Sequence, residues 1–287
     1  MITIKNEYII AKFTEMGAEL KSLVCNGEEQ IWCADEKVWG KSCPVLFPIC
    51  GGLKDDKYIL NGKEYTLEKH GYARTSMFSV EKAEEDSVTF LLCSNDDTKK
   101  VFPFDYELRI IYTLIERTLK VEYKVTNLSK EVMYFSIGSH EGYATPEGIE
   151  DYDIIFPQKE TLSSIGTVGK ILDDKGSIVL KDSNVLPLYE KDFLNDALVF
   201  KKINSRSVKM RNRKTGREIQ VDFPDSPYLL LWQVSGAKYI CIEPWSGFPD
   251  DINSDYNFAE KEGINKVQPG DIFSAAHKIT IVKTTNE

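Results

Sequence analysis

Residues 106–125 read YELRIIYTLIERTLKVEYKV, and this stretch decides the fold class. It contains two runs, Tyr106 to Leu114 and Thr118 to Val125, that are rich in the β-branched and aromatic residues that suit a pleated surface. We therefore expect a strand in each run. The other runs of the same character are Tyr8 to Thr14, Leu20 to Val24, Val132 to Ile137, Tyr228 to Val234, Tyr239 to Ile242 and Lys278 to Val282.

Turn residues between these runs indicate antiparallel pairing. Asn26-Gly27 and Asn61-Gly62 have the residues that reach positive φ in two-residue hairpin turns, and Lys214-Thr215-Gly216 is a similar candidate. Gly51-Gly52 is also expected to be a turn, because a phosphate-binding glycine loop needs a preceding strand, a following helix and further glycines.

Helical patterns are almost missing from the chain. Only Asp35 to Gly40 and Asp255 to Gly263 look briefly helical, so the parallel βαβ repeat and the usual dinucleotide fold are excluded. The polar stretch from Glu160 to Asp192 is interpreted as loops and edge strands. With no repeat and no Pro/Ser-rich linker, we predict an all-β chain with one domain over residues 1–287, a size that a single sandwich or barrel can reach.

The composition of the chain excludes several classes of function. It has 287 residues with 36 Lys+Arg against 45 Asp+Glu, a formal charge of −9, which argues against a nucleic-acid partner. No stretch of about 18 apolar residues indicates a membrane span, and Lys5 and Glu7 interrupt any secretory signal. The six cysteines have no C-x-x-C spacing and are interpreted as buried reduced thiols of a cytoplasmic protein.

The three histidines are the candidate acid or base groups, because their unperturbed pKa lies near neutrality. His277 begins an apolar strand with no chemistry around it, so a structural or solvent-facing role is favoured. His70 opens a loop, beside a glycine, an aromatic residue and Arg74, and His140 ends a strand in the sequence IGSHEGY, residues 137–143. Both lie where a scaffold can hold a loop residue in fixed geometry, although each alone could equally be structural.

Glu243 is the candidate carboxylate. It closes a run of apolar strand residues and is held extended by Pro244. A carboxylate at the end of a buried strand is costly unless it has partners or a task. Trp245 just beyond it offers a flat apolar face, and this combination suits a sugar. The alternative is a core tryptophan beside a salt-bridged glutamate.

Taken together, these motifs resemble the aldose 1-epimerase, or galactose mutarotase, superfamily, most closely its LacX-like bacterial branch. The resemblance covers nearly the whole chain. The segments that carry it are Pro44-Val45-Leu46-Phe47-Pro48 with Leu53-Lys54-Asp55, His70-Gly71-Tyr72-Ala73-Arg74, Ile137-Gly138-Ser139-His140, Asn195-Asp196-Ala197-Leu198-Val199-Phe200 and Glu243-Pro244-Trp245.

This resemblance implies a large antiparallel β-sandwich, the galactose mutarotase-like supersandwich, and interconversion of the α and β anomers of a sugar in carbohydrate, notably galactose, metabolism. It implies no cofactor and no metal. Glu243 would be the base that takes the proton from the anomeric hydroxyl, His140 the acid that protonates the ring oxygen, and His70 a group that holds that oxygen. The residues implied to bind the sugar are Asp196, Arg74, Trp245, Tyr72 and Phe47.

Two departures from the family pattern affect these expectations. Gly52 stands where most relatives have a sugar-binding arginine, so an expected guanidinium is missing. Glu141-Gly142-Tyr143 replaces the Pro-Ala-Phe that commonly follows the second histidine. Glu141 could stabilise the charged form of His140, or it could point to solvent without effect.

The sequence leaves several functions open. A mutarotase for neutral aldoses is favoured over a hexose-6-phosphate epimerase, because the charge of −9 gives no general steering toward a dianion. A non-catalytic sugar-binding protein of the same fold is a further alternative, and a metal site built from two histidines and a carboxylate is a remote one. The basic cluster from Lys209 to Arg217 is interpreted as a solvated hairpin face. A monomer and a homodimer are both compatible with the sequence.

Overall fold

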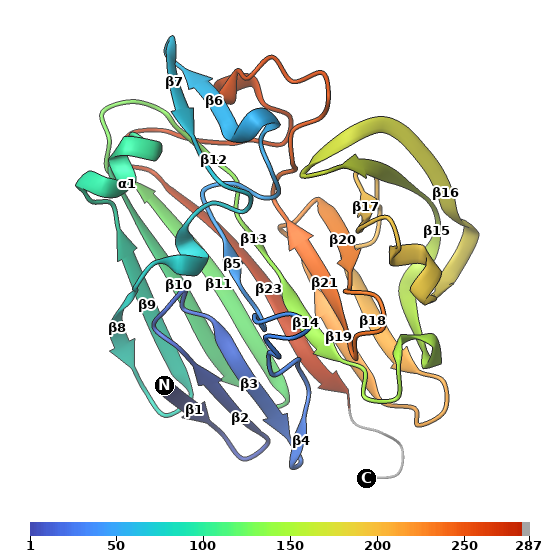
Figure 1. The fold of residues 1–287 in the computed structure, drawn as a ribbon. Helices are drawn as coiled ribbons and strands as arrows, with labels where there is room; N and C mark the ends of the chain where they lie inside the picture. Colours follow the sequence, from blue (N-terminus) through green and yellow to red (C-terminus); the bar gives the residue numbers. More distant parts are fainter. Residues whose placement is uncertain (283–287) are drawn as a thin grey trace.

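The computed structural model describes residues 1–282, and these residues are predominantly antiparallel β-sheet (Figure 1). A 15-stranded sheet has the order β5-β13-β21-β20-β17-β15-β18-β19-β23-β11-β10-β9-β8, with β14 paired to β21 and β16 to β15. Its strands are β5 (Val45–Leu46), β8 (Ser79–Ala83), β9 (Ser87–Cys93), β10 (Tyr106–Ile115), β11 (Thr118–Asn127), β13 (Gly138–Ser139), β14 (Glu141–Ala144), β15 (Tyr152–Val168), β16 (Ile171–Pro187), β17 (Leu198–Phe200), β18 (Ser207–Asn212), β19 (Glu218–Asp222), β20 (Tyr228–Trp232), β21 (Tyr239–Trp245) and β23 (Ile272–Val282).

Smaller sheets and short helices complete the described part of the chain. A four-stranded sheet contains β1 (Ile2–Lys5), β2 (Ile9–Phe13), β3 (Leu20–Cys25) and β4 (Glu28–Glu29). Two strand pairs are β6 (Lys57–Leu60) with β7 (Lys63–Thr66), and β12 (Met133–Phe135) with β22 (Asn265–Val267). The helices are α1 (Asp96–Val101) and the 3₁₀ turns Lys54–Asp56, Ala73–Thr75, Ile149–Asp151, Glu190–Phe193 and Phe258–Glu260.

The four-stranded sheet packs on one part of the large sheet. Figure 1 shows β1–β4 in front of β9 to β11. Phe13 of β2 contacts the rings of Phe90 and Tyr112, with centroids 6.0 and 4.4 Å apart. The Tyr112 hydroxyl donates to the carbonyl of Ala18 at 2.9 Å. Aromatic side chains therefore join the two layers of the predicted sandwich.

The strands β10 and β11 are formed by residues 106–127, which include the stretch that predicts the fold class. They pair residue for residue from Tyr106↔Asn127 to Ile115↔Thr118. Along β10, buried and partly exposed residues alternate, because successive side chains point to opposite faces of a strand. Glu116, in the tight turn between them, has a positive φ of 50°. All eight predicted strands are found, with boundaries that differ by up to six residues.

One local prediction was wrong and two were correct in part. Asp35 to Gly40 forms no helix: it folds into a turn in which the Trp39 amide donates to the Asp35 carbonyl at 2.7 Å, and Trp39 packs on Tyr239. Between Asp255 and Gly263 only the 3₁₀ turn Phe258–Glu260 is helical. The stretch from Glu160 to Asp192, expected to contain loops, belongs mostly to the 17-residue strands β15 and β16. The expected edge position is correct for β16, which among the strands of residues 1–282 pairs with β15 alone.

The structure also bears on the predictions about buried cysteines and membrane-spanning segments. Cys33 and Cys93 are exposed, so the prediction of six buried thiols was wrong for these two. Within residues 1–282, no helix has both the length and the apolar character that a membrane crossing requires.

Candidate active site

A cavity of about 250 Å³ brings together six of the eight predicted site residues. Those six are His70, His140, Glu243, Asp196, Arg74 and Trp245. They come from segments far apart in the sequence, some on strands of the large sheet and others, such as His70 and Arg74, on the loop that follows β7. The cavity is therefore the candidate active site.

Strand β21 presents Glu243 and Trp245 to this cavity. Side chains two residues apart on a strand share a face, and β21 is buried along its whole length. The indole N–H of Trp245 donates to the carbonyl of Ser139 at 2.9 Å. Gly138 lies against the same indole, where a Cβ would come within 2.5 Å of Trp245 Cδ1. Glycine is thus required at position 138 for β13 to pack beside Trp245.

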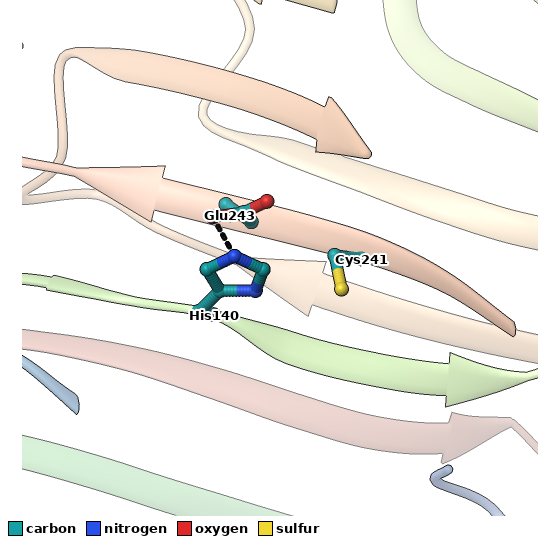
Figure 2. Close-up of side chains that lie close together, drawn as sticks. All are labelled: His140, Cys241 and Glu243. Atoms are coloured by element: carbon teal, nitrogen blue, oxygen red, sulfur yellow. Dashed lines mark ion pairs between the residues drawn. The ribbon is translucent and has the colours of Figure 1, made fainter. Parts of the chain in front are cut away.

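His140 and Glu243 form the closest pair of titratable groups in the cavity. Nε2 of His140 lies 3.4 Å from Oε2 of Glu243, as Figure 2 shows. His140 is 8% exposed and Glu243 is 1% exposed. His140 Nδ1 and Glu243 Oε2 have no hydrogen-bond partner among residues 1–282. Both atoms are buried and have open hydrogen-bonding capacity.

Two tryptophan rings pack against His140. The Trp39 centroid lies 5.1 Å from that of the imidazole, with 32° between the planes. Trp232 contacts it edge to face at 5.4 Å. Both tryptophans also line the cavity, so they hold the imidazole in place and offer apolar surface to a ligand.

His70 is fixed by the loop that precedes β6. The Gly51 amide donates to Nδ1 of His70 at 3.1 Å, and the His70 amide donates to the Gly51 carbonyl at 2.8 Å. Because Nδ1 accepts a hydrogen bond, the neutral ring carries its proton on Nε2. The ring lies edge to face with both His140 and Trp245, each at 5.6 Å between centroids.

Burial shifts the pKa values of Glu243, His140 and His70 in the direction that favours the uncharged form of each side chain. It raises the pKa of Glu243 well above its usual range, with Lys69 opposing and the Glu141 charge reinforcing the shift. It lowers the pKa of His140 to about 3, and Lys69 lowers it further. The pKa of His70 is likewise well below its usual value through burial and through His140. Burial therefore favours the uncharged form of all three groups, a protonated Glu243 carboxyl and two neutral imidazoles.

Four cationic side chains, Lys41, Lys69, Arg74 and Lys170, also line the cavity, with Asp196 as the carboxylate besides Glu243. Arg74 donates through Nη2 to the carbonyl of Lys69 at 3.0 Å. The cavity thus differs in charge from the whole chain, whose net charge is −9.

The sequence also matches a known family. The aldose 1-epimerase family matches residues 1–279. The chain belongs to this family. Protein LacX of Lactococcus lactis subsp. lactis, in a plasmid and a chromosomal form, is 33% identical over 300 residues, which cover 98% of this chain and 99% of LacX. Membership in the aldose 1-epimerase family indicates a mutarotase-type role and a sugar substrate.

Solved structures of similar proteins support the galactose mutarotase-like β-sandwich. A galactose mutarotase related enzyme from Lactobacillus acidophilus has a TM-score of 0.94 and 35% identity, with 100% of this chain and 98% of that chain covered. A galactose mutarotase-like protein from Lactobacillus casei has a TM-score of 0.91 and 29% identity, with 98% of this chain and 100% of that chain covered.

Phe47 and Tyr72 do not line the cavity, so the structure does not bring these two predicted sugar-binding residues to the site. Phe47 is fully buried in the hydrophobic core. Its carbonyl accepts from the amides of Tyr72 and Ala73, at 3.1 Å each. The Tyr72 hydroxyl donates to that of Tyr106 at 3.1 Å. Both residues instead anchor the loop that carries His70.

Glu141 does neither of the two things expected of it. It is 5% exposed and pairs with His277, whose Nε2 lies 3.0 Å from Glu141 Oε1. Because His140 and Glu141 are consecutive residues of an extended segment, their side chains leave the sheet on opposite faces. The structural role favoured for His277 is confirmed, although this residue is buried and does not face solvent.

One group within residues 1–282 has the composition of a metal site. Ligand atoms of His140, Cys241 and Glu243 all lie within 4.8 Å of one another (Figure 2). Thiolate sulfur, imidazole nitrogen and carboxylate oxygen are all ligands that zinc takes in proteins. However, burial raises the pKa of the Cys241 thiol well above its usual value, which disfavours the thiolate that binds metal. The group fits a proton-transfer pair better than a metal.

Five charged or aromatic cavity residues were missed by sequence reasoning: Trp39, Lys41, Lys69, Lys170 and Trp232. The position of Lys69 beside His70 was a usable signal. Trp39 was assigned to a helix that does not form, and Lys170 lies at the turn of a hairpin that was not recognised.

Proposed function

We propose that this protein is an aldose 1-epimerase that interconverts the α and β anomers of a hexose by acid/base opening and closure of the ring. The observation that carries the proposal is the buried pair of Glu243 and His140, 3.4 Å apart, in which burial favours a protonated carboxyl beside a neutral imidazole. Mutarotation requires that one proton be removed and another supplied at neighbouring oxygens of the sugar. A positioned pair with a single mobile proton meets that requirement.

The first half of the reaction opens the ring. The proton moves from Glu243 to His140 across their close contact when the bound sugar stabilises the charged forms. The Glu243 carboxylate then takes the proton of the C1 hydroxyl, the C1–O5 bond breaks, and O5 takes the proton of His140. C1 becomes an aldehyde, and the pair returns to protonated Glu243 with neutral His140. Burial favours this same distribution in the free protein.

The second half closes the ring on the other face. Rotation about C1–C2 presents the opposite face of the aldehyde to the C5 hydroxyl. The same transfers run backward, and each is typically worth about 10²–10⁴-fold in rate. His70 contributes a fixed donor: its Nδ1 is occupied by the Gly51 amide, so its Nε2–H is available to the ring oxygen. The proton transfers and the hydrogen bond to the ring oxygen thus require only the side chains of Glu243, His140 and His70.

Binding and orientation fall to the other cavity residues. Asp196 would accept hydrogen bonds from the sugar hydroxyls, and Arg74 would donate hydrogen bonds to them. Trp245, Trp39 and Trp232 would pack on the C–H face of the sugar ring, as aromatic rings do in apolar contacts.

A hexose 6-phosphate is the second candidate substrate, and a specific observation favours it. Lys41, Lys69, Arg74 and Lys170 give the cavity four cationic groups, against the net charge of −9 on which the preference for a neutral sugar was based. A local positive patch attracts a dianion whatever the net charge of the chain.

The test is polarimetry of freshly dissolved α-D-glucose, α-D-galactose and their 6-phosphates, with the wild type and with Glu243→Gln. We expect acceleration of anomer exchange for at least one sugar by the wild type, and its loss in the variant. Sugar binding by calorimetry without faster exchange would instead identify a non-catalytic sugar-binding protein. Equal acceleration by both proteins would exclude Glu243 as the base.

A further inference from the structure

The hairpin of β15 and β16 reaches the rim of the cavity with its tip. Figure 1 shows the two long strands beside β17, β20 and β21. Thr167, Lys170 and Leu172, at or next to the turn, line the cavity together with the catalytic pair. The hairpin therefore supplies one wall of the candidate active site.

The tip of this hairpin packs directly against Gly52. Its amide donates to the Lys170 carbonyl at 3.2 Å. A Cβ at position 52 would lie 2.5 Å from the Cβ of Lys170 and 2.6 Å from its carbonyl oxygen, closer than such atoms approach. Glycine at position 52 thus allows the backbone of the hairpin to lie where a side chain would otherwise stand.

Further backbone hydrogen bonds tie the tip to neighbouring loops. The Leu172 amide donates to the Asp250 carbonyl at 2.8 Å, and the Asp250 amide donates to the Gly52 carbonyl at 2.8 Å. The Ile252 amide donates to the Leu172 carbonyl at 3.0 Å, and the Thr167 hydroxyl donates to the Asn195 carbonyl at 3.3 Å. The backbone at Lys170 is therefore held in one position relative to the cavity.

The ammonium group of Lys170 is positioned as well. It forms an ion pair with Asp56, on the 3₁₀ turn that follows the Gly51-Gly52 loop. An ammonium has three donors, so the pair with Asp56 leaves two. The side chain of Lys170 is about half exposed, and Lys170 is one of the residues that line the cavity.

We propose that Lys170 is a substrate-binding residue, which the hairpin tip delivers into the site because Gly52 makes room for it. It would donate to an oxygen of the sugar remote from C1, either a hydroxyl or a phosphate oxygen, since the oxygens at the reacting centre are engaged by Glu243, His140 and His70. This inference rests on the proposed function, and it adds the cation that determines which sugars bind well.

The experiment compares wild type, Lys170→Met and Lys159→Met in the polarimetric assay, and measures binding of the same four sugars by calorimetry. Methionine keeps the length of the stem and removes the ammonium. Lys159 is the matched control, because it lies on the same hairpin and pairs with a carboxylate, Asp182, but does not line the cavity. We expect Lys170→Met to raise KM and Kd about 10- to 100-fold, as for a lost hydrogen bond to a charged group, with kcat changed by less than about 3-fold. Lys159→Met should match the wild type.

A second variant tests the contact between Gly52 and the hairpin tip. Gly52→Ala should displace the tip, raise KM in the same direction and increase amide exchange in residues 167–172. Unchanged KM and Kd in Lys170→Met, or the same increase in Lys159→Met, would overturn the role of Lys170. Failure of the proposed function is distinguishable: a wild type that binds a sugar without accelerating its exchange contradicts the epimerase, while the comparison of Kd values still decides the role of Lys170. A wild type that binds none of the four sugars contradicts both.

Discussion

The pKa of His140 makes a quantitative prediction about stability. In the folded protein, burial keeps this imidazole uncharged down to a pH of about 3. In the unfolded chain it should titrate near its usual value of about 6.5. Between these values the unfolded state binds a proton that the folded state does not, so the stability contributed by neutral His140 is complete above about pH 6.5 and is lost as the pH falls toward 3.

The magnitude follows from proton linkage. Protonation of an unfolded-state histidine with a pKa of about 6.5 lowers the free energy of unfolding by about 0.2 kcal/mol at pH 7 and by about 2 kcal/mol at pH 5. The wild type should therefore lose about 2 kcal/mol over this interval because of His140 alone. An asparagine at this position cannot titrate, so His140→Asn should not show this loss.

The assay is urea unfolding of both proteins at pH 7, 6 and 5, followed by tryptophan fluorescence. Titrations common to the two proteins cancel in the difference between their free energies of unfolding. We expect that difference to shift by about 2 kcal/mol in favour of the variant from pH 7 to pH 5. A difference that stays constant within about 0.5 kcal/mol would show that folded His140 carries a proton at pH 5. The proton distribution on which the mechanism rests would then be wrong.

Three other predictions concern single features of the site. The rate of anomer exchange should fall as the pH rises through the raised pKa of Glu243, because the Glu243–His140 pair then loses its mobile proton. If the same decrease in rate at alkaline pH remained in Glu243→Gln, this assignment would be contradicted. Trp39→Leu should lower kcat/KM about 10-fold or more, because it removes the ring packed on His140, and steady-state kinetics would check it. Phe47→Leu should cost about 1–3 kcal/mol of stability in urea unfolding and leave KM within about 2-fold; a large change in KM at unchanged stability would restore Phe47 to the binding site.

The fold class was predictable because local patterns dominate it. Strands β10 and β11 alternate buried and partly exposed residues along their length, and a tight turn joins them. The hairpin of β15 and β16 was not predictable in the same way. Its outer part is polar and largely exposed on both faces, so the sequence lacks the apolar alternation that marks a strand.

The candidate catalytic residues were predictable from the types and places of a few side chains, whereas their environment was not. His70 and His140 each follow a strand and Glu243 lies within β21, and each stands in a distinctive motif. The partner of Glu141 is His277, which is 136 residues away and meets it only through the packing of β14 against β23 in the fold. In the same way, Lys170 reaches the cavity only because Gly52, distant in sequence, accommodates the hairpin tip.

The position of Phe47 and Tyr72 illustrates a limit of reasoning from motifs. Both lie within segments that also contain, or directly precede, cavity residues, and neighbours in sequence were taken as neighbours in the site. In the structure the chain alternates between core and cavity, and the core residues hold the loop that presents His70. A motif can therefore be specific to a family while only some of its residues contact the ligand.

The most direct test of the central claim is a double-variant comparison at Glu243 and His140. Exchange rates for the preferred sugar would be measured by polarimetry for Glu243→Gln, His140→Asn and the variant with both changes. Because the two groups act on one proton as a unit, each single variant should lose about 10²–10⁴-fold in kcat, and the double variant should be no slower than the slower single variant within about 3-fold. A single variant that keeps the wild-type rate would contradict the account.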